Sequence, residues 1–285
     1  MQRIALIIGA QKSGTTSLFR YLAQHPQICA SKKKESLFFS SDIRASRGLD
    51  YYFSLWDWQE QHHVAIEASP AYTMLPAYSQ VTQRIAQVKD VEFLFLYIMR
   101  NPLQRIESHV VHQLSTGVLK VPEVTEDTIA FSKYAYQLDP FVQTFGRERL
   151  HLLLLEDLQR SPEDELRKVY RFLGIDAEIK LPELTQVHNG REANYFHLPL
   201  RLRQLYTSSL GMATVGRIPK SLRRSFYNIL PRKKPHEFNL SDPEKGRILQ
   251  ALQPDLVRLQ NEYGVEGIEE KWQLPLAEPL VGSLD

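Results

Sequence analysis

The glycine-framed segment 9–17 has the residue types of an anion-binding loop. It follows the apolar run 4–8 and precedes Leu18, Tyr21 and Leu22, whose spacing predicts a helix. A strand, a glycine turn and a helix start in that order direct backbone N–H groups and the positive end of the helix dipole toward one point. The pattern therefore predicts a phosphate site in this loop.

Lys12 distinguishes the loop from the P-loop of nucleotide triphosphatases. In that motif the lysine follows the second glycine, where this chain has Thr15. The apolar run 93–99 also ends in Arg100 instead of an acid that would hold Mg²⁺. We therefore expect phosphate binding without a metal ion. A Mg²⁺-dependent nucleotide kinase and a non-catalytic protein that keeps a nucleotide-binding fold are the alternatives.

A second candidate phosphate site lies at the end of the run 93–99. A continuous apolar run is typical of a strand buried on both faces of a parallel sheet, and ligands bind at the carboxyl ends of such strands. Arg100 is at that end, and Asn101-Pro102 predicts that a helix begins there. Ser108 then lies about two turns along, where its hydroxyl can join the guanidinium around a phosphate. For Arg100 alone, a surface ion pair is the alternative.

These two segments together resemble the nucleotide-binding motifs of the sulfotransferases that use 3′-phosphoadenosine 5′-phosphosulfate (PAPS). The resemblance covers roughly residues 3–175 and implies a P-loop-like sulfotransferase fold, PAPS as the sulfate donor and no metal. It implies that Lys12 stabilises the departing 5′-phosphate oxygen and that Arg100 and Ser108 bind the 3′-phosphate. The loop residues that it assigns to the nucleotide are Lys12, Ser13, Gly14, Thr15, Thr16 and Ser17.

The segment Glu35-Ser36-Leu37-Phe38-Phe39 narrows the resemblance, and residues 48–52 and 67–72 extend it. It is similar to the Glu-x-x-Phe-Phe segment of heparan-type N- and O-sulfotransferases and of related bacterial enzymes, in which the glutamate is the catalytic base. The resemblance implies that Glu35 takes the proton of the acceptor. The lysines 32–34 would favour its ionised form if they lie close to it.

Other assignments for the base remain open. Glu35 could instead be a surface carboxylate paired with its neighbouring lysines. His112 is also a catalytic candidate, because it lies one helical turn past Ser108, and His109 is a further rival.

The resemblance also bears on the rest of the nucleotide site. A loop at Arg191 is similar to the family's late basic loop, which contacts the 3′-phosphate and the adenine. The family often has a tyrosine at the position of Leu155, so the adenine contact must come from elsewhere in this chain.

The resemblance indicates the acceptor only by class. It favours a hydroxyl or amine of a glycan or other small metabolite. The alternative is a lipid or a polyketide hydroxyl on a carrier protein. Segment 198–236 is basic, contains no acidic residue and is predicted to be mostly helical. It is a solvated face, a lining of the acceptor cleft, or a docking site for an acidic carrier or anionic surface.

The order of the elements predicts one α/β domain over residues 1–285. Apolar runs alternate with helical patterns, which predicts a three-layer fold with a central parallel sheet and helices on both faces. We expect no nucleic-acid partner, and the oligomeric state is left open. The predicted strands are 4–8, 64–67, 93–99 and 150–155, and the predicted helices are 15–24, 76–88, 102–115, 126–145 and 162–173.

The cysteine count and the shortness of the apolar runs predict a cytoplasmic location. Cys29 is the only cysteine, so no internal disulfide can form, which suits a reducing compartment. The N-terminal apolar run is too short for a signal peptide or a membrane span. The glycan-sulfating enzymes of animal cells, in contrast, are anchored in the secretory pathway.

Overall fold

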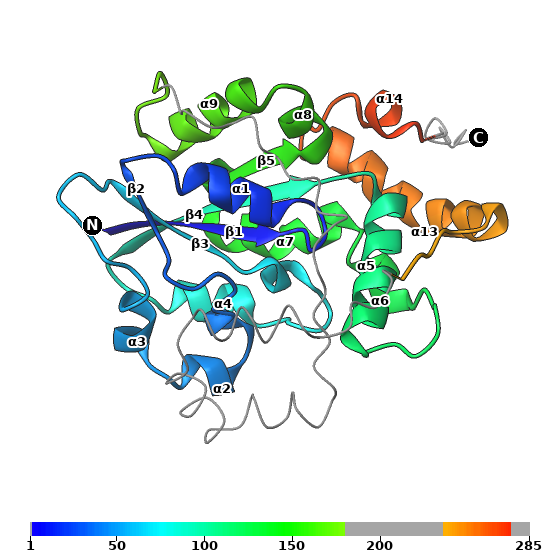
Figure 1. Cartoon of the computed structure of the whole chain (residues 1–285), viewed down its shortest axis with the longest axis horizontal. Coiled ribbons are helices and arrows are strands. Elements are labelled where there is room, and N and C mark those ends of the chain that lie inside the picture. The colour runs from blue at the N-terminus through cyan, green and yellow to red at the C-terminus, as the bar shows by residue number, and fades with distance from the viewer. Residues whose placement is uncertain (1, 180–235, 275–285) are drawn as a thin grey trace, which may run out of the picture. The chain divides into compact units, whose positions relative to one another are not determined.

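The computed structural model describes residues 2–179 and 236–274, and its centre is a five-stranded sheet (Figure 1). All four neighbouring pairs are parallel, in the order β2-β3-β1-β4-β5. The strand order reverses at β1, and open α/β sheets bind ligands in the crevice at such a point. The strands are β1 Gln2–Gly9, β2 Ile28–Ala30, β3 Val64–Ala68, β4 Val91–Met99 and β5 Leu150–Leu154.

Helices cover both faces of the sheet, which confirms the predicted three-layer α/β architecture (Figure 1). On one face, Ile7 and Leu96 belong to a buried cluster with Leu18 of helix α1 and residues of helix α9. On the other face, Phe95 packs against Phe141 of helix α7, with ring centroids 5.1 Å apart. The apolar runs of β1 and β4 are buried on both sides for this reason.

The helices keep the predicted order but differ in detail from the sequence pattern. Within residues 2–179 and 236–274, three 3-10 turns at Phe38–Ser40, Pro70–Thr73 and Arg147–Arg149 lie between the helices. The α-helices are α1 Thr15–Leu22, α2 Asp42–Ala45, α3 Leu49–Phe53, α4 Val81–Ala86, α5 Pro102–Thr116, α6 Glu126–Ala130, α7 Tyr134–Phe145, α8 Leu155–Arg160, α9 Pro162–Leu173, α13 Asp242–Asn261 and α14 Ile268–Trp272.

Three predicted boundaries were wrong. The single helix expected over 126–145 is two helices, and Ser132 between them accepts a hydrogen bond from Arg105 instead of continuing a helix. The helix expected over 76–88 is only Val81–Ala86, because Pro76 lies in the preceding turn region. The strand expected over 150–155 ends at Leu154, because helix α8 begins at Leu155. Strand β2 was not predicted, since three residues carry too little pattern.

The helix expected over 162–173 has the predicted bounds. Helix α9 begins at Pro162 and ends before Gly174, which has the left-handed conformation expected of a C-terminal cap (φ 68°). Ser241 caps α13 and forms a reciprocal capping box with Glu244.

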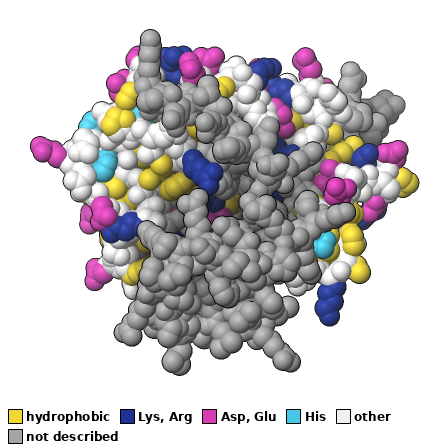
Figure 2. Space-filling view, in the orientation of Figure 1, with side chains coloured by type: hydrophobic (Ala, Val, Ile, Leu, Met, Phe, Trp, Pro, Cys, Tyr) yellow, Lys and Arg dark blue, Asp and Glu magenta, His cyan; other side chains and the backbone are white. Residues whose placement is uncertain are grey.

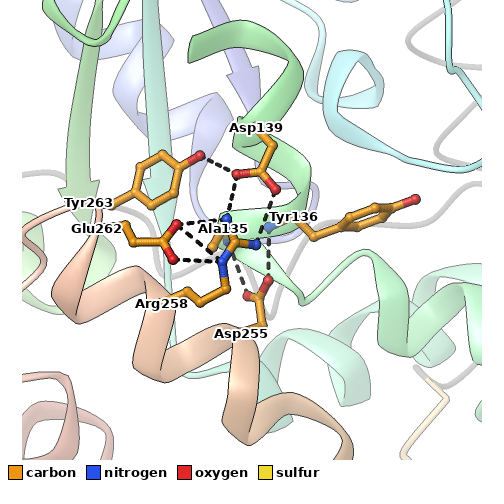
Figure 3. A network of polar contacts seen from close by, with 7 residues as sticks. All are labelled: Ala135, Tyr136, Asp139, Asp255, Arg258, Glu262 and Tyr263. Carbon is orange, nitrogen blue, oxygen red and sulfur yellow. Dashed lines mark hydrogen bonds and ion pairs between the residues drawn. The ribbon is translucent and has the colours of Figure 1, made fainter. Parts of the chain in front are cut away.

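A network of charged groups joins α13 to α7 (Figure 3). The Asp255 carboxylate accepts hydrogen bonds from Ala135 N at 3.1 Å and Tyr136 N at 2.8 Å, at the first turn of α7. Arg258 pairs with Asp139 of α7 at 2.9 Å. The network therefore fixes α13 to the layer that covers one face of the sheet.

The internal contacts group the chain into two units. The first contains residues 1–109, 124–187 and 239–285, and the whole sheet belongs to it. The second contains residues 110–123 and 188–238, most of which lie outside the described residues. The single domain over 1–285 stays a prediction.

Candidate active site

The loop between β1 and α1 is closely packed at both of its glycines. A Cβ at Gly9 would lie 2.1 Å from Thr73 Oγ1 and 2.4 Å from the ring of Tyr97. Gly14 has a φ of 91°, and a Cβ there would lie 2.6 Å from the side chain of Leu155. No other residue type fits these positions without rearrangement. Leu155, where the family often has a tyrosine, thus packs against the loop itself.

The loop has the features of an anion site. Gly14 is the N-cap of α1, and no side chain caps the first-turn amides of the helix. Ser13 is fully buried, and its hydroxyl has no hydrogen-bond partner within the described part of the chain. Thr15 is buried, whereas Thr16 is exposed. A phosphate would satisfy the free donors, so the residues present fit such a group.

The structure brings the loop and the Arg100 motif together. Nη1 of Arg100 donates a hydrogen bond to the carbonyl oxygen of Lys12 at 3.3 Å, across 88 positions of sequence. Burial, and next the positive charge of Arg100, lower the pKa of Lys12. Two cations held this close are unfavourable without an anion, and a phosphate group would relieve their repulsion.

Arg100 lies just before α5, whose start is organised by Asn101. The Asn101 Oδ1 atom accepts a hydrogen bond from Leu103 N at 2.9 Å and so caps the helix. Nη2 of Arg100 donates to Gln104 at 2.7 Å. Ser108 lies on the same helix, as the sequence predicted, and its side chain is half-buried. Its contact with a 3′-phosphate stays a prediction.

Glu35 lies in electrostatic reach of Lys12. Its negative charge raises the pKa of Lys12, against the larger effects of burial and Arg100. Its side chain is 53% exposed and pairs with Lys34 at 2.7 Å. Lys32 instead pairs with Asp57 at 2.6 Å. Of the lysines 32–34, therefore, Lys34 is the one with an ion pair to Glu35.

Glu67 was not assigned a role from the sequence. Its side chain is fully buried at the carboxyl end of β3, and burial raises its pKa. Its Oε1 atom accepts hydrogen bonds from Ser36 Oγ at 3.0 Å and from Ser69 Oγ. A glutamate inside the apolar strand Val64–Ala68 was the signal that could have identified it.

The burial of Arg105 was also not predicted from the sequence. Its guanidinium is fully buried, with Nε donating to Ser132 Oγ and Nη2 to Thr128 O, both at 2.5 Å. Burial lowers its pKa to about 10, so the group stays positive at neutral pH. Only the tertiary structure distinguishes it from an ordinary helix-surface arginine.

The remaining candidate residues are His109, His112 and Arg191. His109 is buried and packs edge-on against Phe131, with ring centroids 5.8 Å apart. His112 belongs to the second contact unit, so its position relative to the loop is not described. Arg191 and residues 198–235 of the basic segment lie outside the described residues.

Charged side chains of both signs share the described surface (Figure 2). On the face in Figure 2, lysines and arginines of the described residues are mixed with acidic side chains. Residues 2–179 and 236–274 contain no group of three or more His, Cys, Asp or Glu side chains placed to hold a metal ion. Within those same ranges, none of the helices has the length and apolar character needed to cross a membrane.

The chain is similar in sequence to heparan sulfate sulfotransferases. The chain is 25% identical over 252 residues to heparan sulfate glucosamine 3-O-sulfotransferase 5 of Mus musculus, covering 82% of this chain and 69% of that protein. It is 26% identical over 184 residues to the 3-O-sulfotransferase 3A1 of the same organism, and spans 45% of its length.

A solved structure shows the same fold. The crystal structure of a sulfotransferase from Alicyclobacillus acidocaldarius is 26% identical, with a TM-score of 0.53 over 79% of this chain and all of the other. The family model described as the sulfotransferase domain matches residues 2–237. The chain therefore belongs to the sulfotransferase family and is a sulfotransferase.

Proposed function

We propose that this enzyme transfers the sulfuryl group of PAPS to a hydroxyl or amine of a glycan or another small metabolite. The observation that carries the proposal is the contact between Arg100 and the Lys12 carbonyl, with Glu35 close enough to act on the charge of Lys12. This arrangement brings together a candidate phosphate-binding arginine, a cation for the leaving group and a base.

Each side chain has a distinct role in the proposal. The amides of 14–17 and the hydroxyls of Ser13, Thr15, Thr16 and Ser17 hold the 5′-phosphate. Arg100 and Ser108 hold the 3′-phosphate, and Arg191 adds a contact to the nucleotide. No resident metal ion takes part.

The transfer itself needs a base and a cation. Glu35 removes the acceptor proton as the acceptor atom attacks sulfur, while the bond from sulfur to the 5′-phosphate oxygen breaks. Lys12 stabilises the negative charge that develops on that oxygen. His112 is the alternative base.

A binding experiment tests the nucleotide part of the proposal. PAP, the desulfated product with 3′- and 5′-phosphates, should bind far more tightly than 5′-AMP, which lacks the 3′-phosphate. Isothermal calorimetry on the wild type measures both affinities. Equal affinities would contradict the proposed 3′-phosphate site, and tight Mg²⁺-dependent ATP binding with turnover would instead favour a kinase.

The acceptor is tested by a transfer screen with sulfur-35-labelled PAPS. The names of the relatives favour a heparan sulfate oligosaccharide that contains glucosamine as the first acceptor to test. The second arm of the screen offers a hydroxyacyl group on an acidic carrier protein, and the third a hydroxylated lipid. Transfer only in the second or third arm would replace the glycan. Cytoplasmic localisation is proposed with it and is tested by cell fractionation.

A further inference from the structure

Two residues with unfavourable backbone conformations flank Ser36 in the turn that carries Glu35. Glu35 has a φ of 60° and Leu37 a φ of 55°, a left-handed region that non-glycine residues rarely occupy. Such a conformation persists only where surrounding contacts hold it. The contacts that hold this backbone conformation therefore determine the position from which the Glu35 side chain extends.

Two hydrogen-bonded chains run from this turn to one buried oxygen atom. Leu37 N donates to Ser69 Oγ at 3.0 Å, and that hydroxyl donates to Glu67 Oε1. Phe38 N donates to Ser36 Oγ at 3.2 Å, and this hydroxyl donates to the same Oε1 atom at 3.0 Å. Glu35 N is held separately by the Ala68 carbonyl at 2.8 Å. The turn is therefore fixed to the carboxyl end of β3.

We infer that Glu67 is a positioning residue for the proposed base Glu35, because its buried oxygen holds the turn through Ser36 and Ser69. This inference rests on the proposed function of Glu35. Ser36, Ser69 and Glu67 are all buried, so the network is shielded from water. In a low-dielectric interior such bonds are strong, and losing their common acceptor leaves two hydroxyls unsatisfied.

The required chemical feature is an acceptor oxygen, which gives a matched pair of variants. Glu67→Gln keeps a carbonyl oxygen for both serines, whereas Glu67→Met keeps the side-chain length and removes every acceptor. With the best acceptor from the screen, Glu67→Met should lower kcat at least 10-fold and Glu67→Gln less than 3-fold. The dissociation constant of PAP should stay within 2-fold in both. If no acceptor reacts, hydrolysis of PAPS to PAP and sulfate, with water as acceptor, is measured instead.

A double-mutant cycle separates positioning from general support of the fold. If Glu67 acts through Glu35, adding Glu67→Met to Glu35→Gln should change kcat less than 2-fold. The same 10-fold loss in both backgrounds would overturn the inference. Full activity of Glu35→Gln alone would instead refute the proposed base, so the two failures are distinguishable.

Hydrogen exchange tests the turn without any acceptor. The amides of Leu37 and Phe38 should exchange at least 10-fold faster in Glu67→Met than in Glu67→Gln, with β1 and β4 unchanged. Equal exchange would refute the network. Should Glu67→Met fail to fold, the Ser36→Ala/Ser69→Ala double variant removes both chains and must show the same faster exchange and lower kcat.

Discussion

Arg105 in α5, close in sequence to Arg100, and Glu67 in β3, bonded to the turn that carries Glu35, are both fully buried ionisable side chains, and they behave differently. Arg105 lies in α5, five residues after Arg100, and donates to neutral oxygen atoms, so its positive charge is not cancelled there. Glu67 accepts from two serines and holds the turn that carries Glu35. In the proposed site, the nucleotide side would thus keep a permanent charge, and the acceptor side would use a buried carboxyl to set geometry.

This difference has a physical basis. Arginine stays protonated even when burial lowers its pKa to about 10. A buried glutamate can relieve its desolvation by taking up a proton, and burial raises the pKa of Glu67 accordingly. Permanent charge suits the binding of phosphates, which are anionic throughout the reaction. A hydrogen-bond acceptor suffices to hold a turn in either protonation state.

The largest effect is expected on the acceptor side, from Glu35→Gln. This variant keeps the shape of Glu35 but cannot take a proton, so the transfer rate should fall roughly 10²–10⁴-fold. PAP affinity, measured by calorimetry, should be unchanged. His112→Ala is the comparison variant and should lose less. The opposite ranking, with His112→Ala or His109→Ala inactive, would move the base onto α5.

Lys12→Ala tests the residue that the proposal places at the leaving oxygen, between the nucleotide and the acceptor. Its charge matters most as the 5′-phosphate oxygen departs, so turnover should fall about 10²-fold, more than PAP affinity falls. Single-turnover kinetics beside calorimetry provide both values. The pKa of Lys12 is lowered, so wild-type activity should also decline with rising pH before a normal lysine would titrate. Near-normal turnover in Lys12→Ala would refute the assignment.

Arg100→Ala tests the nucleotide side alone. The 3′-phosphate is unchanged by the reaction, so PAPS and PAP should both bind more weakly by about 1.5–3 kcal/mol. Arg100→Lys keeps the charge but loses the planar guanidinium. Its PAP affinity should therefore lie between those of the wild type and Arg100→Ala. Calorimetry with PAP gives the result, and unaltered affinity in Arg100→Ala would place the 3′-phosphate site elsewhere.

Arg105 should contribute to PAP affinity through its charge alone. Arg105→Met removes the charge at similar length and should weaken PAP by about 1 kcal/mol, with a loss of stability from unsatisfied partners. Arg105→Lys, which stays charged, is the control for binding. Equal PAP affinity of Arg105→Met and Arg105→Lys, after correction for the folded fraction, would mean that Arg105 is purely structural. The contrast drawn between its charge and the carboxyl of Glu67 would then be wrong.

Asp255 is a buried carboxylate outside the site, and its variant should have the smallest effect on transfer. Asp255→Asn should leave PAP affinity and kcat unchanged. Burial raises the folded pKa of Asp255 to about 6 from 3.8, so the protonated form favours the folded state. The stability advantage of wild type over Asp255→Asn should therefore be greatest below pH 4. It should decrease by at most about 3 kcal/mol as the pH rises to 7.

Urea denaturation of both proteins at pH 4.5 and pH 7 measures this change. An advantage that grows with pH would mean that the two backbone N–H donors, not burial, control the carboxylate. A change in PAP affinity would show that the network in Figure 3 reaches the site.

The sequence determined the elements whose pattern is local. The loop 9–17, the apolar runs of β1 and β4, and the capped helix Pro162–Leu173 were predictable, because hydrophobic period, glycine position and caps act over a few residues. The three-residue strand β2 and the break before Tyr134 were not, because each depends on distant contacts.

The tertiary structure decided which charges matter and how they act on one another. Nothing local in the sequence indicated that Arg100 would contact the Lys12 carbonyl or that Arg105 would be buried without a carboxylate partner among its hydrogen bonds. Glu67 meets Ser36 only because β3 lies beside the turn after β2, and a 31-residue separation hides that contact from any periodic pattern. Burial and electrostatic coupling depend on packing between elements, so only the assembled fold determines them.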